Sequence, residues 1–336
     1  MADALLSPAV GGVMLAASVG AIGYAVKKTS DTGDDRKIPI MGVLGAFVFA
    51  GQMINFTIPG TGSSGHIGGG ILLAALLGPY PALLTLASVL LIQCLFFADG
   101  GLLAYGCNVF NMGVIACFFA YRLIFKPLVK DGFSRGRIVL ASVLAVAGGL
   151  QAGAFCVVLE TLISGVTELP FGTFVLLMQP IHLAIGIVEG LVTGAALCYV
   201  QAIRPELLDR AGQNAPVPAG IPLTKVVVSF IVLAAVTGGL LSLFASAYPD
   251  GLEWSMEKTA GTTELEREGP VYEAAASVVE ATAFMPDYGF AGDEAGNPLG
   301  TTVAGIIGSG ITVLIACGIG FLIRLGRNSR NGSRAA

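Results

Sequence analysis

Charged side chains are scarce in this sequence. Only 12% of its 336 residues are Asp, Glu, Lys or Arg, whereas a soluble domain carries about 25%. Hydrophobic residues make up 54% of the chain, and the mean hydropathy is +0.81. This composition excludes a soluble globular domain and predicts an all-α polytopic membrane protein. The 47 glycines favour a compact bundle, because small residues let membrane helices approach closely.

Residues with catalytic or metal-binding chemistry are also few. The chain has two histidines, His66 and His182, and six cysteines, no two of which have the CxxC spacing. The cysteines therefore fit neither a thiolate zinc site nor a disulfide framework, and we expect them to be small buried hydrophobes. HExxH and GxSxG motifs are absent, and "YAVKKTS" lacks the glycines of a P-loop. We expect no enzyme, no resident cofactor and no nucleic-acid partner. Uphill transport would need an ion gradient or a partner protein.

Long apolar segments, by contrast, are abundant. About 20 apolar residues are needed to span a bilayer as a helix. Helices are predicted at 5–26, 38–56, 66–79, 80–98, 103–125, 138–160, 174–201, 222–247 and 301–324. The first segment has neither a basic region before it nor a cleavage site after it, so it is predicted to be a retained helix. The predicted organisation is a seven-helix membrane domain (1–205), a cytoplasmic linker (206–221) and a two-helix module (222–336).

The basic residues predict the orientation. Sixteen of the 18 Lys and Arg residues fall in the 27–37 loop, the 122–137 loop, the linker region and the C-terminal tail. With nine helices all four groups lie on one side, which the positive-inside rule assigns to the cytoplasm. The N-terminus is then outside and the C-terminus inside. The external loop 248–300 holds 11 of the 22 acidic residues. We expect a small, partly ordered, solvated segment there.

A few polar residues interrupt the apolar segments. The ionisable ones are Asp99, Glu160, His182 and Glu189; such groups usually face the interior of a bundle or a water-filled cavity. His182 and Glu189 are seven residues apart and lie near one face of a helix. Either interhelical hydrogen bonding or a transport pathway would account for them. Three amides near helix ends could orient a loop or support a site: Asn55, Asn108 and Asn111.

His66 lies in the glycine-rich run "FTIPGTGSSGHIGGG" (56–70), at the outer end of the third predicted helix. An imidazole suits late transition metals such as Ni²⁺ and Co²⁺. One histidine is not a metal site, and on its own helix capping or packing explains it better. The surrounding glycines permit close approach of the backbone to an ion.

Several strings together resemble one family. "DDRKIPIMGVLGAFVFAGQMINFTIPGTGSSGHIGGGILLAALLGPYPA" (34–82), "LIQCLFFADGGLLAYGCNVFNMGV" (91–114) and "IHLAIGIVEGLVTGAAL" (181–197) resemble the CbiM/NikM substrate-binding (S) components of energy-coupling factor transporters for cobalt and nickel. The likeness covers about residues 1–205. "ASAYPDGLEW" (245–254) resembles the PDGLE domain, which is similar to the CbiN/NikN accessory subunits, over about 222–330.

The resemblance implies a seven-helix fold with a metal near its outer surface. In that family the ligands are the N-terminal amine, the backbone nitrogen and imidazole of a His after the initiator Met, and a loop His that matches His66. This near-square-planar nitrogen set suits Ni²⁺ and accepts Co²⁺. Met1 would supply the amine, but Ala2 stands where the His is expected. Either the chain starts further upstream, which the "ADALLSPAVGG" entry favours, or Asp3 replaces the imidazole.

The resemblance also implies the partners. This chain would capture Co²⁺ or Ni²⁺ outside the cell, while a CbiQ-like coupling protein and two CbiO/NikO-like ATPases drive uptake, for cobalamin synthesis or nickel enzymes. The accessory helices and acidic loop would help to load or release the ion. Two other hypotheses stay open. One is a secondary, proton-coupled transporter that uses His182, Glu189 and Asp99. The other is a membrane enzyme or assembly factor without transport activity.

Overall fold

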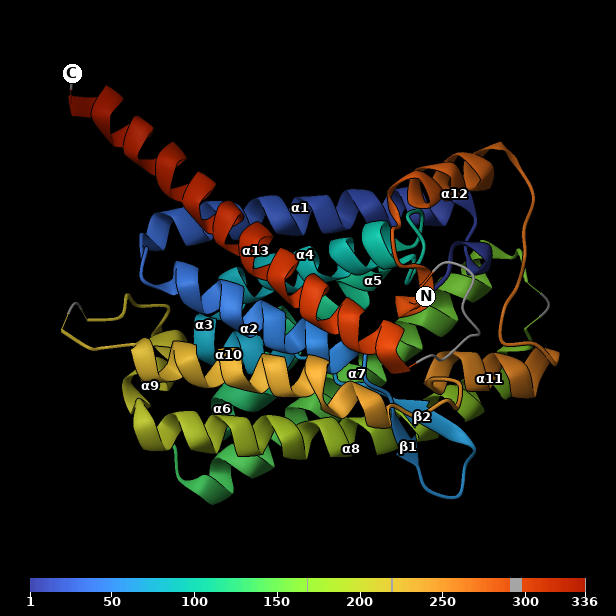
Figure 1. Cartoon of the computed structure of the whole chain (residues 1–336), viewed down its shortest axis with the longest axis horizontal. Helices are drawn as coiled ribbons and strands as arrows, with labels where there is room; N and C mark the ends of the chain where they lie inside the picture. Colours follow the sequence, from blue (N-terminus) through green and yellow to red (C-terminus); the bar gives the residue numbers. More distant parts are fainter. Residues whose placement is uncertain (168, 219, 291–297, 336) are drawn as a thin grey trace.

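The computed structural model describes residues 1–167, 169–218, 220–290 and 298–335, and the described chain is almost entirely helical (Figure 1). The N-terminal half contains η1 (Asp3–Leu5), α1 (Pro8–Thr32), α2 (Lys37–Gln52), β1 (Phe56–Ile58), β2 (Ser63–Gly65), α3 (Gly70–Leu77), α4 (Pro79–Phe97), α5 (Tyr105–Asn108), the π-helix η2 (Val109–Phe125), α6 (Lys126–Leu128) and α7 (Arg135–Ser164). The rest contains α8 (Phe171–Ile203), α9 (Pro205–Gln213), α10 (Thr224–Gly239), η3 (Leu241–Phe244), α11 (Gly251–Ala260), α12 (Pro270–Thr282), η4 (Pro286–Tyr288) and α13 (Pro298–Ala335).

Seven of the described helices are long and apolar enough to cross a membrane. They are α1, α4, the continuous helix Tyr105–Leu128, α7, α8, the segment Thr224–Phe244 and α13. These spans confirm the predicted all-α polytopic membrane fold. The helices in the two remaining predicted segments, 38–56 and 66–79, are shorter than the hydrocarbon core of about 30 Å. At 1.5 Å per residue, α2 is about 24 Å long and α3 about 12 Å long.

The prediction of a helix over 66–79 is therefore only half right. The helix is present from Gly70 to Leu77, but residues 66–69 are irregular backbone. Gly69 has a φ of +76°, a left-handed conformation that glycine adopts at no steric cost. Irregular backbone at this position in a membrane bundle needs partners for its polar groups. The side chains that provide them are described with the site.

Helices α7 and α8 pack backbone against backbone. A Cβ atom on Gly190 would lie 2.5 Å from the Cα of Val143, and one on Gly186 would lie 2.8 Å from the Cα of Ala147. Because the two glycines are four residues apart, they form a groove along one face of α8 into which α7 fits. This contact fixes the face of α8 that carries His182 and Glu189.

The C-terminal helices are built into the bundle. Helix α2, of whose 16 residues only Ile38 and Pro39 are not buried, lies between α4 and the pair α10 and α13. A Cβ on Gly42 would lie 2.5 Å from Cys317 Sγ of α13. The short helix α2 is thus covered by protein on several sides. Most of the exposed surface of α10 and α13 is apolar instead, as expected for lipid contact.

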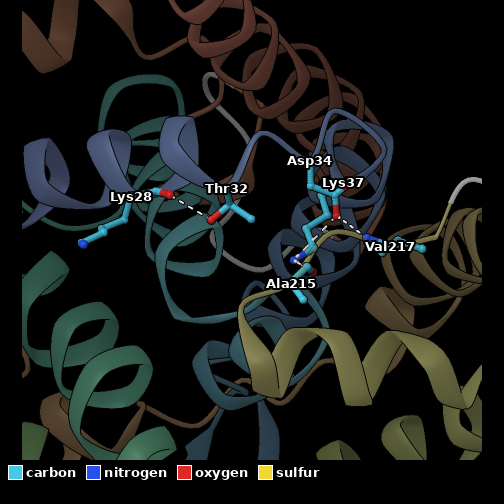
Figure 2. Close-up of polar contacts among 6 residues, drawn as sticks. All are labelled: Lys28, Thr32, Asp34, Lys37, Ala215 and Val217. Atoms are coloured by element: carbon cyan, nitrogen blue, oxygen red, sulfur yellow. Dashed lines mark hydrogen bonds and ion pairs between the residues drawn. The ribbon is translucent and has the colours of Figure 1, made fainter.

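The segment 206–221, predicted to be a linker, begins within α9 and is docked at its far end on the α1–α2 turn. Figure 2 shows the contact: the backbone N–H of Val217 donates to Asp34 Oδ2 over 2.9 Å, and Lys37 Nζ lies 3.5 Å from the Ala215 carbonyl oxygen. Lys37 also lies 3.9 Å from Asp34 Oδ2. Arg36 donates to two carbonyl oxygens of the same segment, those of Pro218 and Ile221. The linker is therefore held in place by this turn.

The two ends of the bundle differ in charge. The α1–α2 turn, α6, α9 and the C-terminus gather at one end, and the four basic groups lie there (Figure 1). The N-terminus, the β1–β2 hairpin, α11 and α12 gather at the opposite end (Figure 1). The described residues of the acidic loop 248–300 lie at this second end (Figure 1). Residues 291–297 of the loop are outside the described chain. The partition of charges assumed in the sequence analysis is thus compatible with the fold.

Candidate metal-binding site

A cavity of about 150 Å³ opens at the acidic end of the bundle. Six of the predicted site residues line it, and four of these come from three separate parts of the chain: Met1, His66, His182 and Glu189. The amides of Asn108 and Asn111 line it too, and so do Asp250 and Gly251 of the C-terminal part. The fold therefore brings both histidines of the protein to the wall of one cavity.

His66 is presented by the irregular segment between β2 and α3. Its neighbour Gly65 lies so close to α8 that an added Cβ would be 2.5 Å from Ile185 Cγ1. The ring nitrogen Nδ1 of His66 is 3.1 Å from the carbonyl oxygen of Ile67. Because a carbonyl only accepts, this contact requires the proton on Nδ1 and leaves a lone pair on Nε2. The half-buried ring can therefore offer Nε2 to a ligand in the cavity.

Two buried polar side chains hold this segment in place. The N–H of Gly69 donates to Glu189 Oε1 over 2.8 Å, and Gln52 Nε2 donates to the carbonyl oxygen of Gly68 over 2.9 Å. Glu189 is only 2% exposed, and its second oxygen, Oε2, has no hydrogen-bond partner among the described residues. Glu189 thus anchors the His66 segment to α8 and keeps one carboxylate oxygen unsatisfied beside the cavity.

His182 lies two turns before Glu189 on α8. Its Nδ1 is 2.8 Å from the carbonyl oxygen of Met178, which belongs to the same helix. Nδ1 of His182 therefore bonds within its own helix and does not make the interhelical hydrogen bond that the sequence suggested. Gly251 packs against the ring: an added Cβ there would lie 3.0 Å from His182 Cε1 and 3.4 Å from Nε2. The C-terminal part of the chain thus closes the cavity directly over His182.

The N-terminal residues are fixed by the loop before α5. The carbonyl oxygen of Met1 accepts from the N–H of Gly101 and from Asn108 Nδ2, each over 3.2 Å. Asp3 Oδ1 accepts from the N–H of Ala104 over 2.8 Å. Asp3 is therefore used in anchoring the N-terminal segment, and it is not among the residues that line the cavity.

The other predicted residues have separate surroundings. Asn111 Nδ2 donates to Glu160 Oε2 over 2.8 Å, while its own Oδ1 has no partner in the described part of the chain. The backbone carbonyl of Asn55 accepts from the N–H of Ser246 over 2.8 Å. Asp99 accepts from the hydroxyl of Tyr288. Asn55 and Asp99 do not line the cavity, so the structure does not group Asp99 with His182 and Glu189.

Sequence reasoning missed the contribution of the segment 248–254. Asp250 caps α11, because its Oδ1 accepts from the N–H groups of Leu252 and Glu253 over 2.8 and 2.9 Å. Ser64 of the β2 strand donates through its backbone N–H to the carbonyl of Pro249 over 2.8 Å. The string "PDGLE" was visible as a motif, but nothing in the sequence showed that it packs on α8.

The donor chemistry of the cavity is rich in nitrogen but contains few side-chain ligands. Across the described residues, no group of three or more His, Cys, Asp or Glu side chains is close enough to hold a metal ion. A metal bound here would need main-chain, amide or water ligands beside imidazole. Imidazole and main-chain nitrogen are suitable for Ni²⁺ and Co²⁺.

Comparisons with known proteins agree with this architecture. Residues 1–207 match the CbiM family model, described as "Cobalt uptake substrate-specific transmembrane region", and residues 224–325 match the PDGLE domain. A putative fused nickel transport protein NikMN of Archaeoglobus fulgidus is 31% identical over 315 residues, which are 93% of this chain and 95% of that protein. A fused nickel transport protein NikMN of Rhodobacter capsulatus is 33% identical over 232 residues, 64% of each chain.

One solved structure shares the fold. The crystal structure of a transition metal transporter is 32% identical in sequence and aligns with a TM-score of 0.54, covering 61% of this chain and 94% of that one. The resemblance predicted from the sequence is thus confirmed for both parts of the chain. The protein belongs to the CbiM family of cobalt-uptake substrate-specific transmembrane proteins and carries a C-terminal PDGLE domain.

Proposed function

We propose that this chain is the substrate-binding component of an energy-coupling factor transporter and captures Co²⁺ or Ni²⁺ outside the cell. The observation that carries the proposal is the placement of His66, whose Nε2 lone pair is available in a cavity also lined by Met1, His182 and Glu189. The relatives in which both parts are fused are named as nickel transport proteins, and another relative, from Sorangium cellulosum, is named as a cobalt transport protein.

The proposed orientation places the cavity outside. The positive-inside rule assigns the end with the α1–α2 turn and the C-terminus to the cytoplasm, so the N-terminus and the cavity face the exterior. The chain itself would hydrolyse no ATP. A CbiQ-like membrane protein and two CbiO/NikO-like ATPases would supply the energy, and the basic end is the face that these partners could reach. Membrane lipid would cover the apolar faces of α1, α8, α10 and α13.

The PDGLE domain would control access to the ion. Its residues Asp250 and Gly251 form part of the cavity wall, and several of its side chains reach the N-terminal domain. Trp254 Nε1 donates to the carbonyl of Thr61 over 3.1 Å, and the Tyr272 hydroxyl to that of Leu6 over 2.7 Å. Metal entry from outside would then require this segment to move.

The test is the variant His66→Ala in the complete chain. Purified protein is titrated with Ni²⁺ and Co²⁺, and uptake of radioactive metal is measured in cells that also express the coupling protein and the ATPases. Loss of a ligand is expected to weaken binding on the order of 100-fold or more, because even outer-sphere partners are worth 10–100-fold. Pro59→Ala, in the exposed turn of the same hairpin, is the control. Normal binding and uptake by His66→Ala would refute the proposal.

A further inference from the structure

We propose that His182 is a second imidazole ligand of the transported ion, through its Nε2, together with Nε2 of His66. The inference rests on the proposed function, since it concerns the same cavity. The likeness to the family supplies a loop histidine and the N-terminus as ligands, whereas His182 comes from α8 and is assigned by the geometry of this chain alone.

Both rings are held in the same tautomer. Nδ1 of His182 is 2.8 Å from the carbonyl oxygen of Met178, and Nδ1 of His66 is 3.1 Å from that of Ile67. Each carbonyl can only accept, so each ring carries its proton on Nδ1 and keeps a lone pair on Nε2. A metal-ligating histidine has this arrangement, in which one nitrogen donates to the protein and the other binds the ion.

The two histidines share a cavity with an unsatisfied polar group. His66 and His182 line one cavity of about 150 Å³, whereas a single water needs only about 10–15 Å³ of such volume. Glu189 lines the same cavity, is 2% exposed and has an oxygen without a partner among the described residues. An unsatisfied buried polar atom is costly, and a cation in the cavity would favour this carboxylate through its charge. Glu189 is outside the proposed ligand set, because no three His, Cys, Asp or Glu side chains of the described residues cluster.

Glycine at position 251 lets the C-terminal segment pack closely on the His182 ring. Any larger residue would place a Cβ about 3 Å from Cε1 and close to Nε2. The C-terminal segment can therefore approach Nε2 of His182 this closely only with a glycine at position 251. Since no three His, Cys, Asp or Glu side chains cluster among the described residues, the remaining ligands would be main-chain groups, an amide or water.

The experiment counts imidazoles. The complete chain, with this sequence and a purification tag free of histidine, is loaded with Ni²⁺ and examined by X-ray absorption spectroscopy. The sequence contains only two histidines, so a count of two assigns both of them. A count of one in the wild-type protein would overturn the proposal, and this readout does not depend on the folding of a variant.

The matched variant is His182→Asn. The asparagine amide can still donate to the Met178 carbonyl but offers no imidazole nitrogen. We expect its Ni²⁺ affinity to fall on the order of 100-fold or more and its imidazole count to fall from two to one. Leu183→Ala, the exposed neighbour on α8, should change neither. An unchanged count in His182→Asn would overturn the proposal even if affinity fell, because His182 would then position other groups only.

The outcome separates this inference from the proposed function. If His66→Ala loses binding while His182→Asn keeps both its affinity and its imidazole count, the transport function stands and only the second ligand is wrong. If His66→Ala binds and transports metal normally, the proposed function itself fails.

Discussion

Replacement of Glu189 tests how the metal-binding segment is held. The N–H of Gly69 donates to Glu189 Oε1 over 2.8 Å in a buried region, and Glu189→Ala removes this acceptor. An unsatisfied buried donor costs about 1–3 kcal/mol, and the lost methylene adds about 0.8 kcal/mol. Together these terms predict a loss of about 2–4 kcal/mol of stability. The freed segment carries His66, so metal affinity should fall as well.

Glu189→Gln is the matched control, because its amide oxygen can still accept from Gly69. A neutral acceptor is weaker than a carboxylate by about 1 kcal/mol, so we expect a smaller loss of stability. The removal of a carboxylate beside the ion should lower the affinity by about tenfold. Thermal unfolding in detergent and Ni²⁺ titration measure the two effects. If Glu189→Ala is no less stable than Glu189→Gln, Glu189 does not anchor the segment. If Glu189→Gln abolishes uptake while binding persists, a proton relay gains support.

Two further predictions concern the C-terminal part of the chain. Gly251→Ala should crowd His182 and Ile185, because atoms of these side chains would lie 3.0 and 2.9 Å from the new Cβ. Metal titration should therefore show weaker binding. Gly212→Ala, which has open space around it, is the control and should bind metal normally. Asp34→Ala should loosen the segment around Val217, because it removes the acceptor of the Val217 N–H, a contact worth about 1–2 kcal/mol. Limited proteolysis should then cut this segment faster than in the control Asp31→Ala. Equal cleavage rates would contradict the role of Asp34.

Hydropathy predicted the long helices because burial in lipid requires about 20 apolar residues whatever their order. It could not predict that 66–69 is irregular. Apart from His66, the residues there are isoleucine or glycine, and the partners that satisfy their backbone, Gln52 and Glu189, come from other helices. Whether glycine continues a helix or interrupts it depends on such distant contacts. The same limit applied to 206–221, where hydropathy could not predict α9 or the contacts with the α1–α2 turn.

The site was predictable only in part for the same reason. The spacing of His182 and Glu189 placed them on one face of α8, and both line the cavity. Asp99 looked equivalent from the sequence, but its carboxylate faces Tyr288, which is 189 residues away. Asp250 and Gly251 looked like part of an exposed acidic loop and instead close the cavity. Contacts between distant segments depend on how helices are arranged, and hydropathy does not report this.

The PDGLE domain is attached to the metal-binding domain by two kinds of contact. Its helices α10 and α13 pack on α2, and α13 makes its closest approach at the glycines Gly42 and Gly45. Its outer segment is held by hydrogen bonds to main-chain carbonyls, such as that from Thr282 to Leu95 over 2.6 Å, and by the burial of Met256 and Met285 against the N-terminal domain. Each such bond is worth only about 0.5–1.5 kcal/mol. The contacts of α11 and α12 with the N-terminal domain are less extensive than those of α10 and α13 with α2. The outer segment can therefore leave the cavity mouth at lower cost than the helices can leave the bundle, while the packing on α2 keeps it tethered nearby.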